Sequence, residues 1–165
     1  MRNQKQKDLC VSVISNGDPL EIFTDKDGEV IFKKYSPIGE LGTFASQYAE
    51  SLSKTSGLPT CITDKDNIIA VFGAPKKELS DKKVSSELEK IMENKVTLLA
   101  KPGEKKIQVV EGVDKYLAGV VAPIIFEGDS IGTVIFMVND TNQDVGEIET
   151  KLAQSAAGFL GKTME

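Results

Sequence analysis

The 165-residue chain is 40% hydrophobic and 27% charged, a composition typical of a folded globular protein rather than a disordered one. It contains no histidine, which excludes the commonest general base and the commonest zinc ligand. The net charge of −5 argues against a general basic surface that binds nucleic acid. All of this charge comes from residues after 35, because residues 1–35 carry six basic and six acidic side chains.

The first sixteen residues hold a short basic segment and a short apolar run. The apolar run, residues 9–14, alternates loosely with polar residues and predicts a strand. It is too short for a signal peptide, and no run in the chain approaches the ~18 residues of a membrane-spanning helix. We therefore expect a cytoplasmic protein.

Residues 18–35 predict one tight β-hairpin. Two β-prone runs, Leu20–Thr24 and Glu29–Tyr35, flank the turn residues 25–28, which end in Asp27-Gly28. Glycine reaches positive φ without a Cβ clash, so this dipeptide favours a turn between two strands. The hairpin separates a short N-terminal segment from about 130 following residues.

A helix is expected to begin at Ser36-Pro37, because serine can cap free amides and proline at the first helical position loses no hydrogen bond. Gly57 is expected to end it. Apolar residues between them recur every three or four positions: Ile38, Leu41, Phe44, Tyr48 and Leu52. We place a domain junction at Tyr35-Ser36, which gives domains 1–35 and 36–165.

The second domain is expected to continue as hairpins and helices that form an α+β sandwich. Ser80 is expected to cap its second helix, and the last helix should begin near Asp144. Val84, Leu88, Ile91 and Met92 should face inward from the former, and Ile148, Leu152, Ala156, Phe159 and Leu160 from the latter. The predicted strands are Thr60–Thr63, Ile68–Phe72, Val96–Ala100, Ile107–Val110, Leu117–Phe126 and Ile131–Val138.

Two groups of residues are candidate binding sites. Arg2, Lys5 and Lys7 form a basic N-terminal arm of the kind that contacts phosphate, although the same three cations are also ordinary in a solvated tail. A cavity between sheet and helices would be lined by Cys61, Thr63, Phe72 and Thr133, and the alternative is that these residues simply fill the core.

The sequence shows no motif of an enzyme or of a cofactor site. It has no glycine-rich phosphate-binding loop before a helix, and two cysteines, Cys10 and Cys61, do not make a structural zinc site. Cys61 as a catalytic nucleophile would lack a histidine to activate it and would lie in an apolar strand. We therefore expect no catalytic activity and no cofactor.

Three stretches resemble one known family. They are GDPLEIFTDKDGEVIFKKYSPI from residue 17, IIFEGDSIG from residue 124 and AAGFL from residue 156. In this order they resemble the SpoVT family, AbrB-type swapped-hairpin transcription regulators with a C-terminal GAF-like domain. The resemblance covers residues 17–165. It implies a partial AbrB-type β-hairpin module followed by a GAF-like antiparallel sheet packed with helices.

The resemblance also implies a function: regulation of late sporulation genes in the forespore through double-stranded DNA. It further implies self-association to a dimer or tetramer and an effector that is an unknown small molecule. The family's DNA-contacting half has no counterpart in residues 1–16, which contain one arginine and no proline. The alternative is therefore a ligand-sensing or dimerisation module that does not bind DNA.

Overall fold

The computed structural model describes residues 20–24, 26–34, 38–139 and 145–164. The chain divides into two compact units, Met1–Ser36 and Pro37–Glu165. The strand predicted at residues 9–14, the basic arm and the junction at Tyr35-Ser36 lie outside the described residues.

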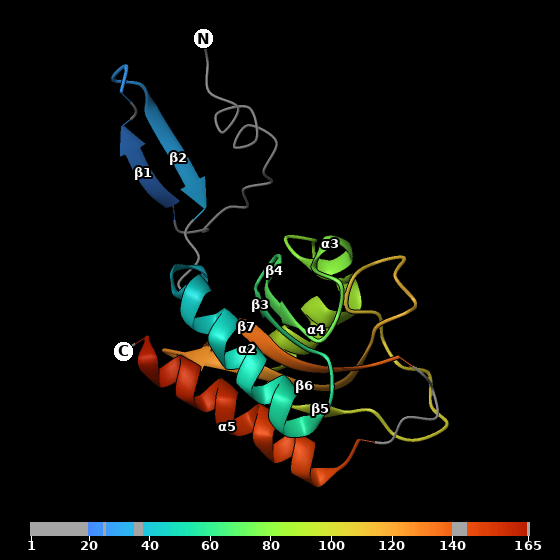
Figure 1. The fold of residues 1–165 in the computed structure, drawn as a ribbon. Coiled ribbons are helices and arrows are strands. Elements are labelled where there is room, and N and C mark those ends of the chain that lie inside the picture. The colour runs from blue at the N-terminus through green and yellow to red at the C-terminus, as the bar shows by residue number, and fades with distance from the viewer. Residues whose placement is uncertain (1–19, 25, 35–37, 140–144, 165) are drawn as a thin grey trace. The chain divides into compact units, whose positions relative to one another are not determined.

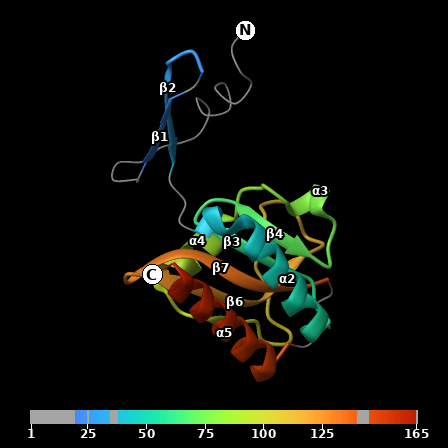
Figure 2. The ribbon, with the colours of Figure 1, turned by 60° about the vertical axis from the view of Figure 1, so that its left-hand side comes forward.

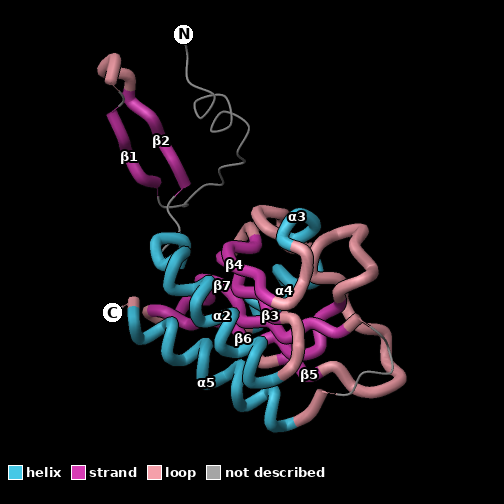
Figure 3. The backbone as a smooth tube through the Cα atoms, in the orientation of Figure 1, coloured by secondary structure: helices cyan, strands magenta, loops and turns pink. Residues whose placement is uncertain are grey.

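The described part of the first unit is a β-hairpin (Figures 1 and 3). Strand β1, Leu20–Thr24, pairs antiparallel with β2, Val30–Lys34, and Leu20 lies opposite Lys34. Gly28 in the connection has φ of 81°, the left-handed conformation that the sequence predicts there. The predicted hairpin is therefore confirmed, with β2 beginning one residue later than expected.

The second unit is built on one antiparallel sheet of five strands in the order β4-β3-β7-β6-β5 (Figure 3). Its centre is the hairpin of β6 and β7, whose turn residues Glu127 and Gly128 both have positive φ, 50° and 83°. Such a two-residue turn matches the twist of the strands it joins. The strands are β3, Thr60–Asp64; β4, Ile68–Phe72; β5, Leu98–Leu99; β6, Leu117–Phe126; and β7, Asp129–Val138.

Helices cover both faces of this sheet. Helices α2, Gly42–Ser56, and α5, Glu147–Thr163, lie side by side on one face (Figures 1 and 2). The short α3, Lys76–Leu79, and α4, Ser86–Asn94, lie on the other. The expected α+β fold, an antiparallel sheet packed with helices, is confirmed. No helix among the described residues has both the length and the apolar character that crossing a membrane requires.

The two faces carry separate apolar clusters. The cluster under α2 and α5 includes Ile62, Val134 and Phe136, and the cluster under α4 includes Ile68, Leu88 and Ile135, all fully buried. Helix α5 lies so close to the sheet that a Cβ on Gly161 would be 2.3 Å from the carbonyl oxygen of Ile125. Glycine at this position therefore sets the distance between helix and strand.

Several predicted boundaries were wrong. The helix start predicted at Ser36-Pro37 lies outside the described residues, and a 3-10 turn, Ile38–Leu41, precedes α2. Ser80 ends α3, and α4 begins six residues later with Ser85 as its N-cap. The strand predicted at Val96–Ala100 has only the two residues of β5, and Ile107–Val110 forms isolated bridges rather than a strand.

The last helix also differs from its prediction. It begins at Glu147 after Gly146, whose N–H donates to the Glu149 carboxylate at 3.1 Å. Ile148 and Phe159, expected to face inward, are 75% and 49% exposed.

We expect Gly161→Ala to lower the free energy of unfolding by about 1–3 kcal/mol, because the added methyl group meets a backbone carbonyl that side-chain rotation cannot move. Gly158→Ala is the matched control in the same helix, since a Cβ there has no neighbour within 4 Å. It should stabilise the protein by up to about 1 kcal/mol through helix propensity alone. Urea unfolding of both variants checks the pair, and equal effects would contradict the proposed close packing of α5.

Candidate functional site

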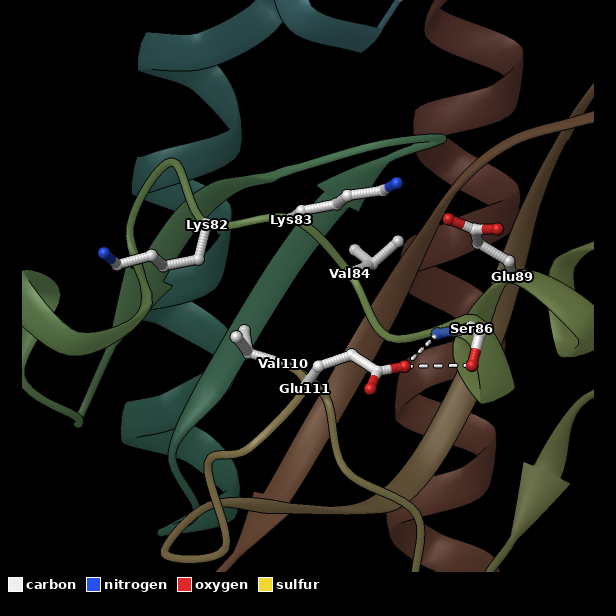
Figure 4. A pocket seen from close by; sticks show the side chains of 7 residues that line it. All are labelled: Lys82, Lys83, Val84, Ser86, Glu89, Val110 and Glu111. Carbon is white, nitrogen blue, oxygen red and sulfur yellow. Dashed lines mark hydrogen bonds between the residues drawn. The ribbon is translucent and has the colours of Figure 1, made fainter. Parts of the chain in front are cut away.

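A surface cavity of about 390 Å³ lies beside the N-terminus of α4 (Figure 4). Its floor is apolar, formed by the buried side chains of Val84 and Val110, and its rim is charged. The lining residues are Lys82, Lys83, Val84, Ser86, Glu89, Val110 and Glu111. They come from the segment before α4, from α4 itself and from the segment between β5 and β6.

Glu111 is bonded to the first residue of α4. Its Oε1 accepts hydrogen bonds from the Ser86 backbone N–H at 3.1 Å and from the Ser86 hydroxyl at 2.9 Å (Figure 4). The backbone bond, then the hydroxyl bond and the nearby Lys83 hold the pKa of the Glu111 carboxyl below its usual value. A carboxylate at this position also meets the positive end of the helix dipole.

Ser85 explains why α4 begins where it does. Its Oγ accepts from the Leu88 N–H at 3.1 Å, the geometry of an N-cap, and donates to the Gln108 carbonyl at 2.6 Å. Its own N–H donates to the Val109 carbonyl at 2.9 Å. One serine thus fixes both the start of the helix and the chain segment that runs past it.

The cavity carries charge of both signs but no arrangement typical of catalysis. The lining includes two ammonium groups, Lys82 and Lys83, two carboxylates, Glu89 and Glu111, and one serine, which is bonded to Glu111. Across the described part of the chain, no three acidic or cysteine side chains gather closely enough to hold a metal ion. The cavity therefore presents charged and hydroxyl groups above an apolar floor.

Three of the four residues expected to line a pocket lie together. Cys61, Thr63 and Thr133 are fully buried on the α4 side of the sheet, on the paired strands β3 and β7. The hydroxyls of Thr63 and Thr133 are 2.7 Å apart and satisfy each other. Phe72 packs into the other cluster, and the Lys54 ammonium lies 5.8 Å from its ring centre.

Burial also bears on the reactivity of Cys61. Loss of solvent around this fully buried thiol raises its pKa far above the ordinary value. Since the thiolate is the nucleophile, this environment keeps the thiol inert. It counts against the alternative of a catalytic cysteine.

An aromatic cluster on α2 and α5 was missed by the sequence interpretation, which placed its members in the core. The ring centres of Phe44, Tyr48 and Phe159 lie 5.7–6.1 Å apart. Phe44 is 37% and Phe159 is 49% exposed. Their helical spacing predicts that these rings face inward. In the structure they lie at the edge of the buried helix face, where α2 and α5 meet solvent. We call these three residues the aromatic cluster.

The Thr63–Thr133 pair supports a specific prediction. Thr133→Val leaves the Thr63 hydroxyl buried without its partner and should lower the free energy of unfolding by about 1–3 kcal/mol. The double variant Thr63→Val/Thr133→Val removes both hydroxyls at nearly constant volume and should regain most of that loss. Urea unfolding of the two variants measures the difference. Additive losses would mean that each hydroxyl has another role, as in a ligand site.

Two comparisons of sequence identify relatives of this chain. Residues 40–165 match a family model described as "Stage V sporulation protein T C-terminal, transcription factor". The chain is also 46% identical over 153 residues to stage V sporulation protein T of Bacillus subtilis (strain 168). That match covers 92% of this chain and 84% of the relative, so it extends beyond residues 40–165 into the hairpin unit.

Comparison with solved structures shows a GAF fold. The GAF domain of a phosphoenolpyruvate-protein phosphotransferase from Coxiella burnetii superposes with a TM-score of 0.59 at 14% identity, over 74% of this chain and 80% of that one. The cofactor-binding GAF domain of the nutrient sensor CodY from Clostridium difficile gives 0.54 at 16% identity, over 73% and 83%. At these identities the likeness concerns the fold alone.

Proposed function

The chain belongs to the stage V sporulation protein T family of transcription factors, and from this premise we propose that it regulates late sporulation genes in the forespore. The supporting observation is the 46% identity over 92% of the chain. We assign DNA binding to an AbrB-like module in residues 1–35, and effector sensing and self-association to the GAF-like domain in residues 36–165.

The hairpin supports the idea of a module completed by a second chain. Among the described residues of the first unit, β1 and β2 form a sheet of only two strands. Leu20, Ile22 and Val30 are 41–67% exposed. A two-stranded hairpin is marginally stable alone, and its free edges can pair with another copy. Exchange of hairpins between two chains would cover this apolar surface.

We propose that the second unit senses an effector, and the support for this comes from its fold and its surface cavity. The CodY domain, which has this fold, is described as cofactor-binding. In this chain the cavity beside α4 offers a charged rim over an apolar floor. The buried group of Cys61, Thr63 and Thr133 is the other candidate, together with Phe72 on the opposite face.

A second candidate function is a GAF-like module that does not bind DNA. It is favoured by one observation: residues 1–16 contain a single arginine, whereas arginine and lysine contacts with phosphate supply most non-specific affinity for DNA. Arg2, Lys5 and Lys7 are the cations available in that segment.

DNA binding is tested by gel-shift titration of the full chain with promoter DNA of sporulation genes at several salt concentrations. We expect retardation at low salt that weakens as salt rises. Neutralising Arg2, Lys5 and Lys7 together should reduce the slope of log K against log salt by roughly 2–3. The matched control neutralises three exposed lysines of the second unit, Lys76, Lys77 and Lys90, and should leave the slope unchanged. Absence of retardation at low salt would favour the second candidate.

Self-association through the aromatic cluster is proposed because exposed aromatic rings are enriched at protein interfaces. With exchanged hairpins, this surface gives each chain two contacts, enough to build a tetramer from two dimers. Hairpin exchange alone would give a dimer.

Replacing Phe44 and Phe159 by serine should halve the mass of the assembly in sedimentation analysis, or weaken its association by about tenfold or more. Val96→Ser is the control, because Val96 is 66% exposed but lies outside the cluster. An unchanged mass in the double variant would show that the cluster is not an interface.

A further inference from the structure

The segment between β5 and β6 is held to the domain by few backbone bonds. Residues 107–114, which we call the strap, form isolated bridges at Gln108–Leu117 and Val84–Val110. Its other backbone bonds to the domain run from the Ala118 N–H to the Ile107 carbonyl at 3.0 Å and from the Ser85 N–H to the Val109 carbonyl at 2.9 Å. The Ser85 hydroxyl also donates to the Gln108 carbonyl at 2.6 Å. By contrast, β6 and β7 are paired from the Leu117 and Val138 pair to the Phe126 and Asp129 pair, with two register shifts.

The strap covers the interior on the α4 side of the sheet. Val109 is fully buried and Val110 is 8% exposed, and both belong to the cluster that contains Cys61, Ile135 and Met137. Glu111, the next residue, is at the surface. The strap therefore passes from the core to solvent within three residues.

A side-chain clasp closes the strap at the point where it reaches solvent. We use this name for the two hydrogen bonds from Ser86 to the Glu111 carboxylate. Beyond it, the strap is tied mainly to itself, since the Gly112 N–H donates to the Gln108 side chain at 3.0 Å and the Gln108 amide donates to Asp114. Among the described residues, the clasp is thus the outermost side-chain bond between the strap and α4, at the edge of the cavity.

We propose that the strap and clasp act as a gate, which opens when Glu111 leaves Ser86 and the bonds from Ser85 to the Gln108 and Val109 carbonyls then break, and which gives access to the apolar interior around Cys61. The charged bond lies at the solvent-exposed end, where local opening begins most easily. The self-bonded loop beyond it can move without breaking its internal bonds. The β6–β7 hairpin and α5 stay in place during this motion.

The effector role proposed above would give this opening a function, and only this function rests on that proposal. An apolar effector entering between sheet and α4 would have to pass the strap, so the clasp would set its rate of entry. The opening itself requires neither DNA nor effector and can be measured in their absence.

The test uses the full chain with Cys10→Ser, so that Cys61 is the single thiol. Iodoacetamide labelling of Cys61 at one fixed pH then reports how often the interior opens. Glu111→Gln weakens the clasp and should accelerate labelling about two- to fivefold, the range expected for one charged contact at a helix N-terminus. Ser86→Ala, which removes one of the two donors, should produce a smaller increase in the same direction.

Two controls separate local opening from general loss of stability. Glu104→Gln changes an exposed acid just before the strap and should label at the parental rate. Amide hydrogen exchange of Ala153–Leu160 in α5 should be unchanged in Glu111→Gln. The proposal is overturned if Glu111→Gln labels like the parent, if Glu104→Gln accelerates labelling equally, or if α5 exchange rises by the same factor.

Discussion

The burial of both faces of the β6–β7 hairpin is the constraint on which the second unit depends. Side chains of β7 alternate between two apolar clusters, with Val134 and Phe136 on one side and Ile135 and Met137 on the other. Neither face can therefore be left to solvent. Helices α2 and α5 cover one side, and α4 with the strap covers the other.

The two coverings differ in how they are made. On the α2 and α5 side, regular helices pack closely, and Gly161 lets the backbone of α5 approach β6. On the α4 side, a nine-residue helix and an irregular segment together cover the sheet. Side-chain bonds from Ser85 and Ser86 hold this segment in place of a continuous ladder of backbone hydrogen bonds. The first side is therefore held by regular helices in close contact with the sheet, whereas the second is held in part by single side-chain bonds.

Strong periodic patterns made most of the fold predictable. The apolar runs of β6 and β7, the turn at Gly28 and the helix stop at Gly57 were all visible in the sequence, because local sterics and burial act there in the same direction. The N-cap of α4 was not predictable: Ser80 and Ser85 are both suitable caps. Ser85 is bonded to the carbonyl of Gln108, a distant residue that only the folded chain brings near.

The candidate site was less predictable for the same reason. The cavity joins residues 82–89 to residues 110 and 111, and no motif links them. Cys61, Thr63 and Thr133 lie near one another on the paired strands β3 and β7, whereas Phe72 faces the other cluster. The aromatic cluster escaped prediction because helical spacing identifies a stripe but not which residues lie at its edge.

The pairing of β3 with β7 has a consequence for the order of folding. Thr63 and Thr133 are 70 positions apart in the chain, whereas β6 and β7 are joined by a two-residue turn. Closing a long loop has a larger entropic cost than closing a two-residue turn, so the hairpin can form first and offer β7 as the template for β3. The chain would thus complete its sheet from the C-terminal half, after most of it has been synthesised.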